Sequence, residues 1–133
     1  MSKRITMKLY LAIGVGGMIG ATARYGISLL FVPDITFPYA TLIVNLIGCF
    51  LLSFLFNQPA IKRKLSPQLF AAIGTGMIGA FTTFSTFAIE IENLWHANGF
   101  TAVSYILISI CGGLFCCFGG YKLASKNRNQ VTS

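Results

Sequence analysis

The stretch FPYATLIVNLIGCFLLSFLFN occupies residues 37–57 and contains no charged side chain. It is long enough to cross the ~30 Å hydrocarbon core of a membrane as an α-helix, which takes about 20 residues. Pro38 near its start and Pro59 after its end are of the residue type that stops helices. The stretch therefore predicts a transmembrane helix.

Three other apolar runs of similar length lie on either side of this one, at residues 9–31, 68–92 and 100–121. Of the 133 residues, 55% are hydrophobic and only 10% are charged, whereas soluble domains are about 25% charged. We therefore expect an all-α membrane protein in which residues 1–133 form one domain of four transmembrane helices. The connections are short, so they leave no room for a soluble catalytic or ligand-binding domain.

Basic residues outnumber acidic ones by ten to three, and their positions matter more than the sum. If the helices alternate in direction, both termini and the 58–67 loop share one side of the membrane. The positive-inside rule places that side in the cytoplasm. Short basic flanks of membrane spans offer no surface that reads bases, so we expect no nucleic-acid partner. All basic residues except Arg24 lie on that side, namely Lys3, Arg4, Lys8, Lys62, Arg63, Lys64, Lys122, Lys126 and Arg128.

Glycines in the first and third runs are spaced for close helix packing. Gly16 and Gly20 are four residues apart, as are Gly76 and Ala80, and small residues at this spacing let two helix backbones approach each other. The string GTGMIG at residues 74–79 also matches the G-x-G-x-x-G motif of dinucleotide-binding folds. That motif has meaning only between a β-strand and a helix, so we interpret these glycines as packing residues.

The chain offers little for enzymatic chemistry or for metal binding by side chains. Its four cysteines lie inside predicted spans without C-x-x-C spacing, and there is one histidine, so chelation by these groups is poorly supported. We interpret the cysteines as packing residues. No nucleophile, base and orienting group occur at one depth, so we expect no catalytic residues and no enzyme.

Asn45 lies near the middle of the 37–57 run. Thr41, one turn before it, and Gly48, nearly one turn after it, share its helix face. A polar group inside a membrane must find a partner or line water. The position alone leaves two interpretations open, an interhelical hydrogen bond and a contact with a transported ligand.

The third run contains the hydroxyl-rich segment TTFSTF at residues 82–87. Hydroxyls bond to helix carbonyls and β-branched residues weaken helix preference, so we expect the third helix to be broken near its middle. A break frees backbone carbonyls, which at membrane depth must be buried in protein, face water or coordinate a cation. The alternative is a continuous helix with hydroxyls bonded back to its own carbonyls.

Aromatic side chains accompany these polar groups. Phe84 and Phe87 are three residues apart, and Tyr105 and Ser109 are four apart, so each pair shares a helix face. Ring edges are electropositive and can contact an anion, although such stripes more often serve packing.

Charged side chains inside or near the runs are few. Arg24 lies well inside the 9–31 run, where it could extend to the interface or stand in a water-filled vestibule that attracts anions. Glu90 and Glu92 fall near the end of the third run, and we interpret both as interfacial.

Three motifs together resemble those of the CrcB/Fluc family of bacterial fluoride channels. They are GMIGATARY at residues 17–25, TLIVNLIG at residues 41–48 and GAFTTFSTF at residues 79–87, and the resemblance covers all four predicted spans. It implies a dimer of two four-helix subunits in opposite orientations, with two narrow fluoride pores along the subunit interface. It also implies a multi-pass protein of the bacterial inner membrane that passively exports cytoplasmic fluoride.

The same resemblance implies roles for individual residues. Backbone carbonyls of Gly79 and Thr82, at the break of the third helix, would help to hold a structural sodium ion on the dimer axis, and Arg24 would lie at a vestibule. Fluoride is small and tightly hydrated, so a selective path must replace its water with weak partners in series. The residues expected to line or border that path are Asn45, Phe84, Ser85, Thr86, Phe87, Tyr105 and Ser109.

The charge distribution conflicts with a homodimer inserted both ways. Such a subunit should carry nearly balanced loop charges, yet here nine basic residues lie on one side and none in the loops of the other. We therefore hypothesise that this chain has a fixed orientation and pairs with an oppositely biased homologue.

Two other functions remain open. A small proton-coupled multidrug exporter also has four short spans, but it needs an ionisable carboxylate deep in a span. Asp34, Glu90 and Glu92 all lie at or near span ends, which disfavours this alternative. A non-transporting membrane scaffold would use the polar residues only to hold helices together.

Overall fold

The computed structural model describes the backbone of residues 2–31 and 37–131, and the side chains of residues 7–31 and 37–126. Within these residues the chain is helical apart from short connections, and no β-strand occurs. The expected all-α fold is confirmed. In chain order the elements are α1 (Ser2–Ser28), α2 (Tyr39–Asn57), α3 (Pro59–Lys64), α4 (Pro67–Ala71), the π-helix η1 (Ala72–Ile78), α5 (Gly79–Phe81), α6 (Ser85–Ala97) and α7 (Gly99–Val131).

Three segments of the described chain are long and apolar enough to cross a membrane, and they coincide with three of the predicted runs. These segments are Tyr39–Asn57, Pro67–Ala97 and Gly99–Lys126. Helix α1 has 27 residues but is not among them, since Lys8, Arg24 and several glycines lower its hydropathy. The structure is that of an all-α membrane protein, while a fourth span and a single four-helix domain stay predictions.

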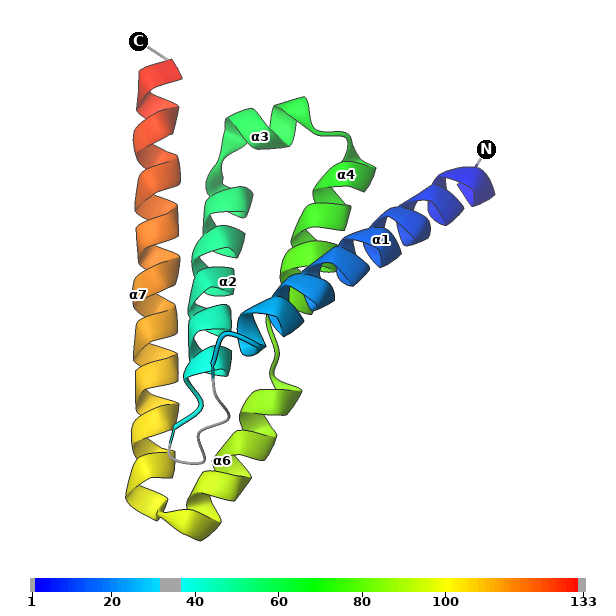
Figure 1. Cartoon of the computed structure of the whole chain (residues 1–133). Coiled ribbons are helices and arrows are strands. Elements are labelled where there is room, and N and C mark those ends of the chain that lie inside the picture. The colour runs from blue at the N-terminus through cyan, green and yellow to red at the C-terminus, as the bar shows by residue number, and fades with distance from the viewer. Residues whose placement is uncertain (1, 32–36, 132–133) are drawn as a thin grey trace.

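The helices are arranged mainly as two packed pairs (Figure 1). Helix α2 lies alongside α7, whereas α1 packs across η1 and α5. Helix α6 diverges from the direction of α4 and packs against the first part of α7. Helix α3 joins α2 to α4 at the end of the molecule where both chain termini also lie.

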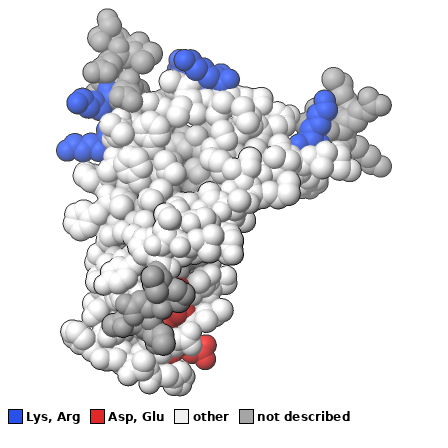
Figure 2. Space-filling model, in the orientation of Figure 1, with Lys and Arg blue, Asp and Glu red and all other residues white. Residues whose placement is uncertain are grey.

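Charge is separated along the length of the molecule. On the face shown in Figure 2, basic side chains lie at the end that carries α3, and acidic side chains lie toward the opposite end. The last turn of α3 alone carries Lys62, Arg63 and Lys64, which are all exposed. This arrangement agrees with the expectation that the termini and the 58–67 loop share one side.

Glycines let the backbones of α1 and η1 touch directly. A Cβ atom added to Gly16 would lie 2.9 Å from the carbonyl carbon of Ala72, and one added to Gly20 would lie 2.8 Å from that of Met77. In the opposite direction, a Cβ on Gly76 would lie 3.2 Å from the backbone nitrogen of Gly17. The three glycines singled out in the sequence therefore lie where this contact leaves no room for a side chain.

Much of the apolar surface is not covered by the subunit itself. In an apolar 18-residue window of each of the three membrane-spanning segments, only 22%, 22% and 17% of the residues are buried. Large side chains such as Phe100, Leu114 and Phe115 are exposed, and a compact apolar cluster of Leu94, Ala102 and Tyr105 forms where α6 meets α7. An apolar surface of this extent must be covered by lipid or by another protein chain.

Candidate functional site

The third membrane-spanning segment is interrupted between α5 and α6. Helix α5 ends at Phe81, α6 begins at Ser85, and Thr82 between them has extended backbone angles, with φ −76° and ψ 160°. The Thr82 hydroxyl can donate to two carbonyls of the preceding turn, that of Ile78 at 3.3 Å and that of Gly79 at 3.2 Å. The predicted break is confirmed, and the alternative of a continuous helix is wrong.

At the break, two backbone amides donate to side chains and not to the carbonyls they would meet in a continuous helix. In a continuous helix the amide of Thr83 would donate to Gly79 and that of Thr86 to Thr82. Instead, the Thr83 amide donates to Asn45 Oδ1 at 2.8 Å, and the Thr86 amide donates to the Thr83 hydroxyl at 3.2 Å. The carbonyls of Gly79 and Thr82, which the sequence resemblance links to sodium, have therefore lost their helical amide donors.

Asn45 of α2 pairs with the backbone of the break through both ends of its amide group. Besides accepting from the Thr83 amide, its Nδ2 donates to the Thr83 carbonyl at 3.0 Å. Gly48, on the same face of α2, packs against the methyl group of Thr82. Of the two interpretations of Asn45, the interhelical hydrogen bond is thus observed, and a contact with a ligand stays a prediction.

Hydroxyl groups cluster where α6 begins. Thr83 is only 8% exposed, and its Oγ1 lies 3.0 Å from Thr86 Oγ1 and 3.4 Å from Ser85 Oγ. Ser85 and Thr86 are exposed. The buried Thr83 hydroxyl therefore holds the first turn of α6, beside two exposed residues that carry hydroxyls.

A line of aromatic rings leads from the break to the α6–α7 contact. Phe84 is 80% exposed, and its ring centroid lies 6.1 Å from that of Phe87. The ring of Phe87 in turn lies 5.1 Å from that of the fully buried Tyr105. The three expected aromatic residues are therefore consecutive neighbours in space.

Glu90 joins this line to α2. Its carboxylate accepts a hydrogen bond from the Thr41 hydroxyl at 2.7 Å and another from the Tyr105 hydroxyl at 2.8 Å. The interfacial interpretation of Glu90 from the sequence missed this bridge between three helices. A signal was present, since Phe87 and Glu90 are three residues apart and share a helix face.

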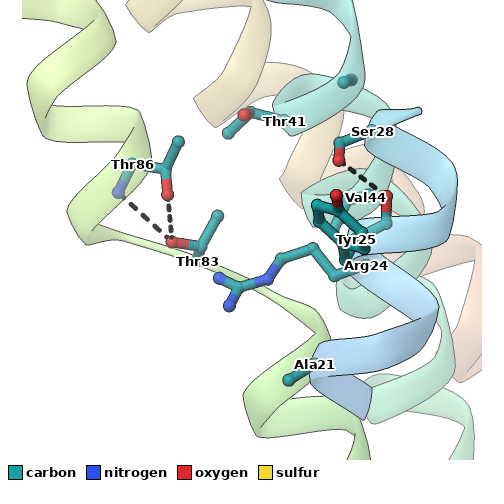
Figure 3. A pocket seen from close by; sticks show the side chains of 9 residues that line it. Ala21, Arg24, Tyr25, Ser28, Thr41, Val44, Thr83 and Thr86 are labelled. Atoms are coloured by element: carbon teal, nitrogen blue, oxygen red, sulfur yellow. Dashed lines mark hydrogen bonds between the residues drawn. The ribbon is translucent and has the colours of Figure 1, made fainter. Parts of the chain in front are cut away.

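Arg24 borders a cavity of about 270 Å³ beside the break. Figure 3 shows its side chain extending from α1 across the cavity toward Thr83. Arg24 is partly buried, and hydroxyls of three helical segments surround the same space. The lining residues are Ala21, Arg24, Tyr25, Ser28, Ala40, Thr41, Val44, Thr83 and Thr86.

Ser109 is the predicted site residue with the least connection to the others. It lies one turn after Tyr105 on α7, and its Oγ is buried without a hydrogen-bond partner among the described residues. No side-chain hydrogen bond in the described part of the chain links it to the break. Its place along a transport path stays a prediction.

Side chains that commonly bind metals do not gather around this site. Within residues 7–31 and 37–126, no three His, Cys, Asp or Glu side chains lie close enough to hold an ion. The four cysteines are free, and the Cys117 thiol donates to the Cys49 carbonyl at 3.5 Å between α7 and α2.

Comparison with known proteins identifies the family. A family model described as "CrcB-like protein, Camphor Resistance (CrcB)" matches residues 11–121, which is most of the chain. The chain belongs to the CrcB-like family. The resemblance stated from the sequence motifs is thereby confirmed.

Relatives of this CrcB-like protein carry names that state a transported ion. "Fluoride-specific ion channel FluC 1" of Desulfitobacterium hafniense (strain Y51) is 44% identical over 110 residues, covering 82% of this chain and 96% of the relative. "Fluoride-specific ion channel FluC 2" of Listeria innocua is 45% identical over 118 residues, covering 88% and 91%. The FluC 1 protein of Bacillus cereus (strain ATCC 10987 / NRS 248) is 42% identical, covering 86% of each chain. A family of ion channels also confirms that the protein is not an enzyme.

Proposed function

We propose that this chain is a subunit of a fluoride-selective channel of the bacterial inner membrane. The similar proteins named as fluoride-specific channels support fluoride as the ion. The observation that carries the proposal is the break at residues 82–84, which places hydroxyls, an amide group and an exposed aromatic ring together inside a membrane-spanning segment.

The groups around the break suit a small, strongly hydrated anion. Ser85 and Thr86 offer accessible hydroxyls, and Phe84 offers a ring edge that is electropositive. Each partner is weak alone, so an ion can exchange its water for a succession of contacts and still be released. Phe87, Tyr105 and Ser109 would border the same path, and Arg24 beside the cavity would raise the local concentration of anions. Conduction through such a path is passive.

A second subunit is needed to complete the site. Gly79, Phe84, Ser85 and Thr86 are exposed in the single chain, yet irregular backbone at membrane depth is not tolerated against lipid. We propose that an antiparallel partner covers the break and that two pores run along the contact between the subunits. A structural sodium ion on the dimer axis would be coordinated by the carbonyls of Gly79 and Thr82, because carbonyl oxygens without amide donors are ligands for hard cations.

The charge distribution supports a fixed orientation and a partner that is not a second copy. The basic end of the molecule (Figure 2) would face the cytoplasm, so the termini would be cytoplasmic. A partner inserted in reverse must carry its own basic residues at its opposite end. We propose that this partner is a homologue with that reversed bias, and that the pair lets cytoplasmic fluoride leave down its electrochemical gradient.

A fluoride-electrode measurement of efflux from liposomes tests the proposal. The chain alone, a homologue of reversed charge bias alone, and both together would be reconstituted at equal protein mass. We expect rapid efflux of fluoride, and not of chloride, from vesicles that contain both chains, with little efflux from either alone.

Each other result has a defined meaning. Robust efflux with this chain alone would refute the need for a homologue but keep the channel. Fluoride efflux that requires a proton gradient would contradict passive conduction, and absence of efflux from all three preparations would overturn the channel itself.

A further inference from the structure

We infer that Asn45 is a positioning residue that holds the break of the third membrane-spanning segment in register through the Thr83 backbone. The inference depends on the proposed function only where it predicts an effect on ion flux. Its structural basis is the pairing of one side-chain amide with one residue's N–H and C=O groups, at 2.8 and 3.0 Å.

The backbone of Thr83 requires such a partner. Residues 82–84 are not helical, so the Thr83 amide and carbonyl cannot both be satisfied within their own segment. Unpaired backbone groups inside a membrane are strongly unfavourable because no water reaches them. The Asn side chain carries an acceptor oxygen and an NH2 donor group at a fixed separation, and the observed pairing uses both groups.

The residues on either side of Asn45 extend this contact over the two halves of the segment. Gly48 lies against the methyl group of Thr82 and near the ring of Phe81, the last residue of α5. Thr41 donates to Glu90, which lies within α6. One face of α2 therefore contacts the half-helix before the break, the break itself and the half-helix after it, and Asn45 is the central contact.

This arrangement limits what else Asn45 can do. Its Oδ1 is occupied by the Thr83 amide and one Nδ2 hydrogen by the Thr83 carbonyl, so one Nδ2 hydrogen remains for any other acceptor. Loss of Asn45 would therefore disorder the break more than it would remove a contact with an ion. The carbonyls of Gly79 and Thr82 and the ring of Phe84 would then lose their positions together.

Hydrogen exchange at the Thr83 amide tests the inference without reference to fluoride. The full chain in lipid nanodiscs would be measured by NMR as wild type, Asn45→Leu and Asn45→Ala, the latter for the case in which a branched side chain is not tolerated. We expect exchange at Thr83 to become about tenfold faster or more in both variants, the effect of an orphaned buried donor. Asn45→Asp, which keeps an acceptor for the Thr83 amide, should return its exchange close to that of wild type.

Asn57 provides a matched control on the same helix. Its Nδ2 donates to the Ser53 carbonyl within α2, and its side chain is exposed. Asn57→Leu should leave exchange at Thr83 unchanged. Faster exchange in Asn57→Leu, equally fast exchange in the Asp and Ala variants of Asn45, or no acceleration in Asn45→Leu and Asn45→Ala would each overturn the positioning role.

Fluoride efflux measured in parallel keeps the two proposals distinguishable. The Leu and Ala variants should lose efflux together with protection of Thr83. Loss of efflux with normal Thr83 protection would contradict positioning and make Asn45 solely an ion contact. If the wild-type pair shows no efflux, the channel proposal fails, while the exchange measurement still decides the role of Asn45.

Discussion

Two contacts hold the third membrane-spanning segment, and they use opposite chemistry. On one side, α1 meets η1 through Gly16, Gly20 and Gly76, where backbone packs on backbone. On the other, α2 meets the break through the amide of Asn45 and the hydroxyl of Thr41, which bond to Thr83 and Glu90. The first contact excludes side chains and needs only close packing. The second keeps polar groups at membrane depth, so we assign fixed support to the first and positioning of the proposed ion path to the second.

Breaking the glycine contact should have the largest effect. In Gly20→Val the added side chain would meet the Met77 carbonyl carbon at 2.8 Å and the Phe81 nitrogen at 3.0 Å. Backbone cannot move aside as a side chain can, so we expect destabilisation of at least about 3 kcal/mol, the upper end for overpacking. Thermal unfolding followed by size-exclusion chromatography would measure it.

Gly14→Val is the matched control, because a Cβ on Gly14 of the same helix meets nothing within 4 Å. Its effect on stability should stay within about 1 kcal/mol, the range of helix propensities. Equal destabilisation by the two valines would mean that helix propensity, and not the α1–η1 contact, determines the result.

A change in the polar contact between α2 and α6 should lower transport more than stability. Glu90→Gln keeps one acceptor oxygen, so at most one of the bonds from Thr41 and Tyr105 retains its present form. We expect a loss of roughly 1.5–3 kcal/mol, as for a hydrogen bond to a charged group, with a clear fall in fluoride efflux from liposomes. Glu92→Gln, two residues further and exposed, should leave efflux unchanged, and equal losses in both variants would contradict a special role for Glu90.

The smallest effect is expected at a polar contact remote from the break. Ser53 of α2 donates to the Cys117 carbonyl of α7 at 2.7 Å. Ser53→Ala should lower stability by about 0.6 kcal/mol, the average for interhelical hydrogen bonds in membranes, and leave the efflux rate unaltered. A large fall in efflux would show that transport depends on the α2–α7 contact, and the proposed division between support and ion path would fail.

The sequence predicted three confirmed spans and the break because both follow from local composition. Uncharged runs predict membrane helices, and the hydroxyls and β-branched residues at positions 82–87 indicated where the third helix ends and restarts. The glycine contact was also predictable, since small residues at spacing four are typical of close helix packing. The first run forms a long helix, but it is less apolar than the other three runs because of its polar and glycine residues.

Tertiary contacts account for what the sequence did not predict. The partner of Asn45 depends on which backbone atoms the break brings to α2, and no pattern in either segment specifies the pairing with Thr83. Glu90 lies near the end of its run and therefore resembled an interfacial residue. Its role became visible only when Thr41 and Tyr105 were found within hydrogen-bond distance.

The central claim is that the break faces an ion path and does not serve only to hold helices together. Phe84 tests it most directly, because its side chain is 80% exposed and contributes little to the packing of its own subunit. The variant Phe84→Ile would be measured in whichever assembly gives efflux with the wild-type chain. Fluoride efflux from liposomes should fall about tenfold or more, while the subunits remain associated and unfold at the wild-type temperature. Unchanged efflux, or loss of efflux only together with loss of assembly, would contradict the claim.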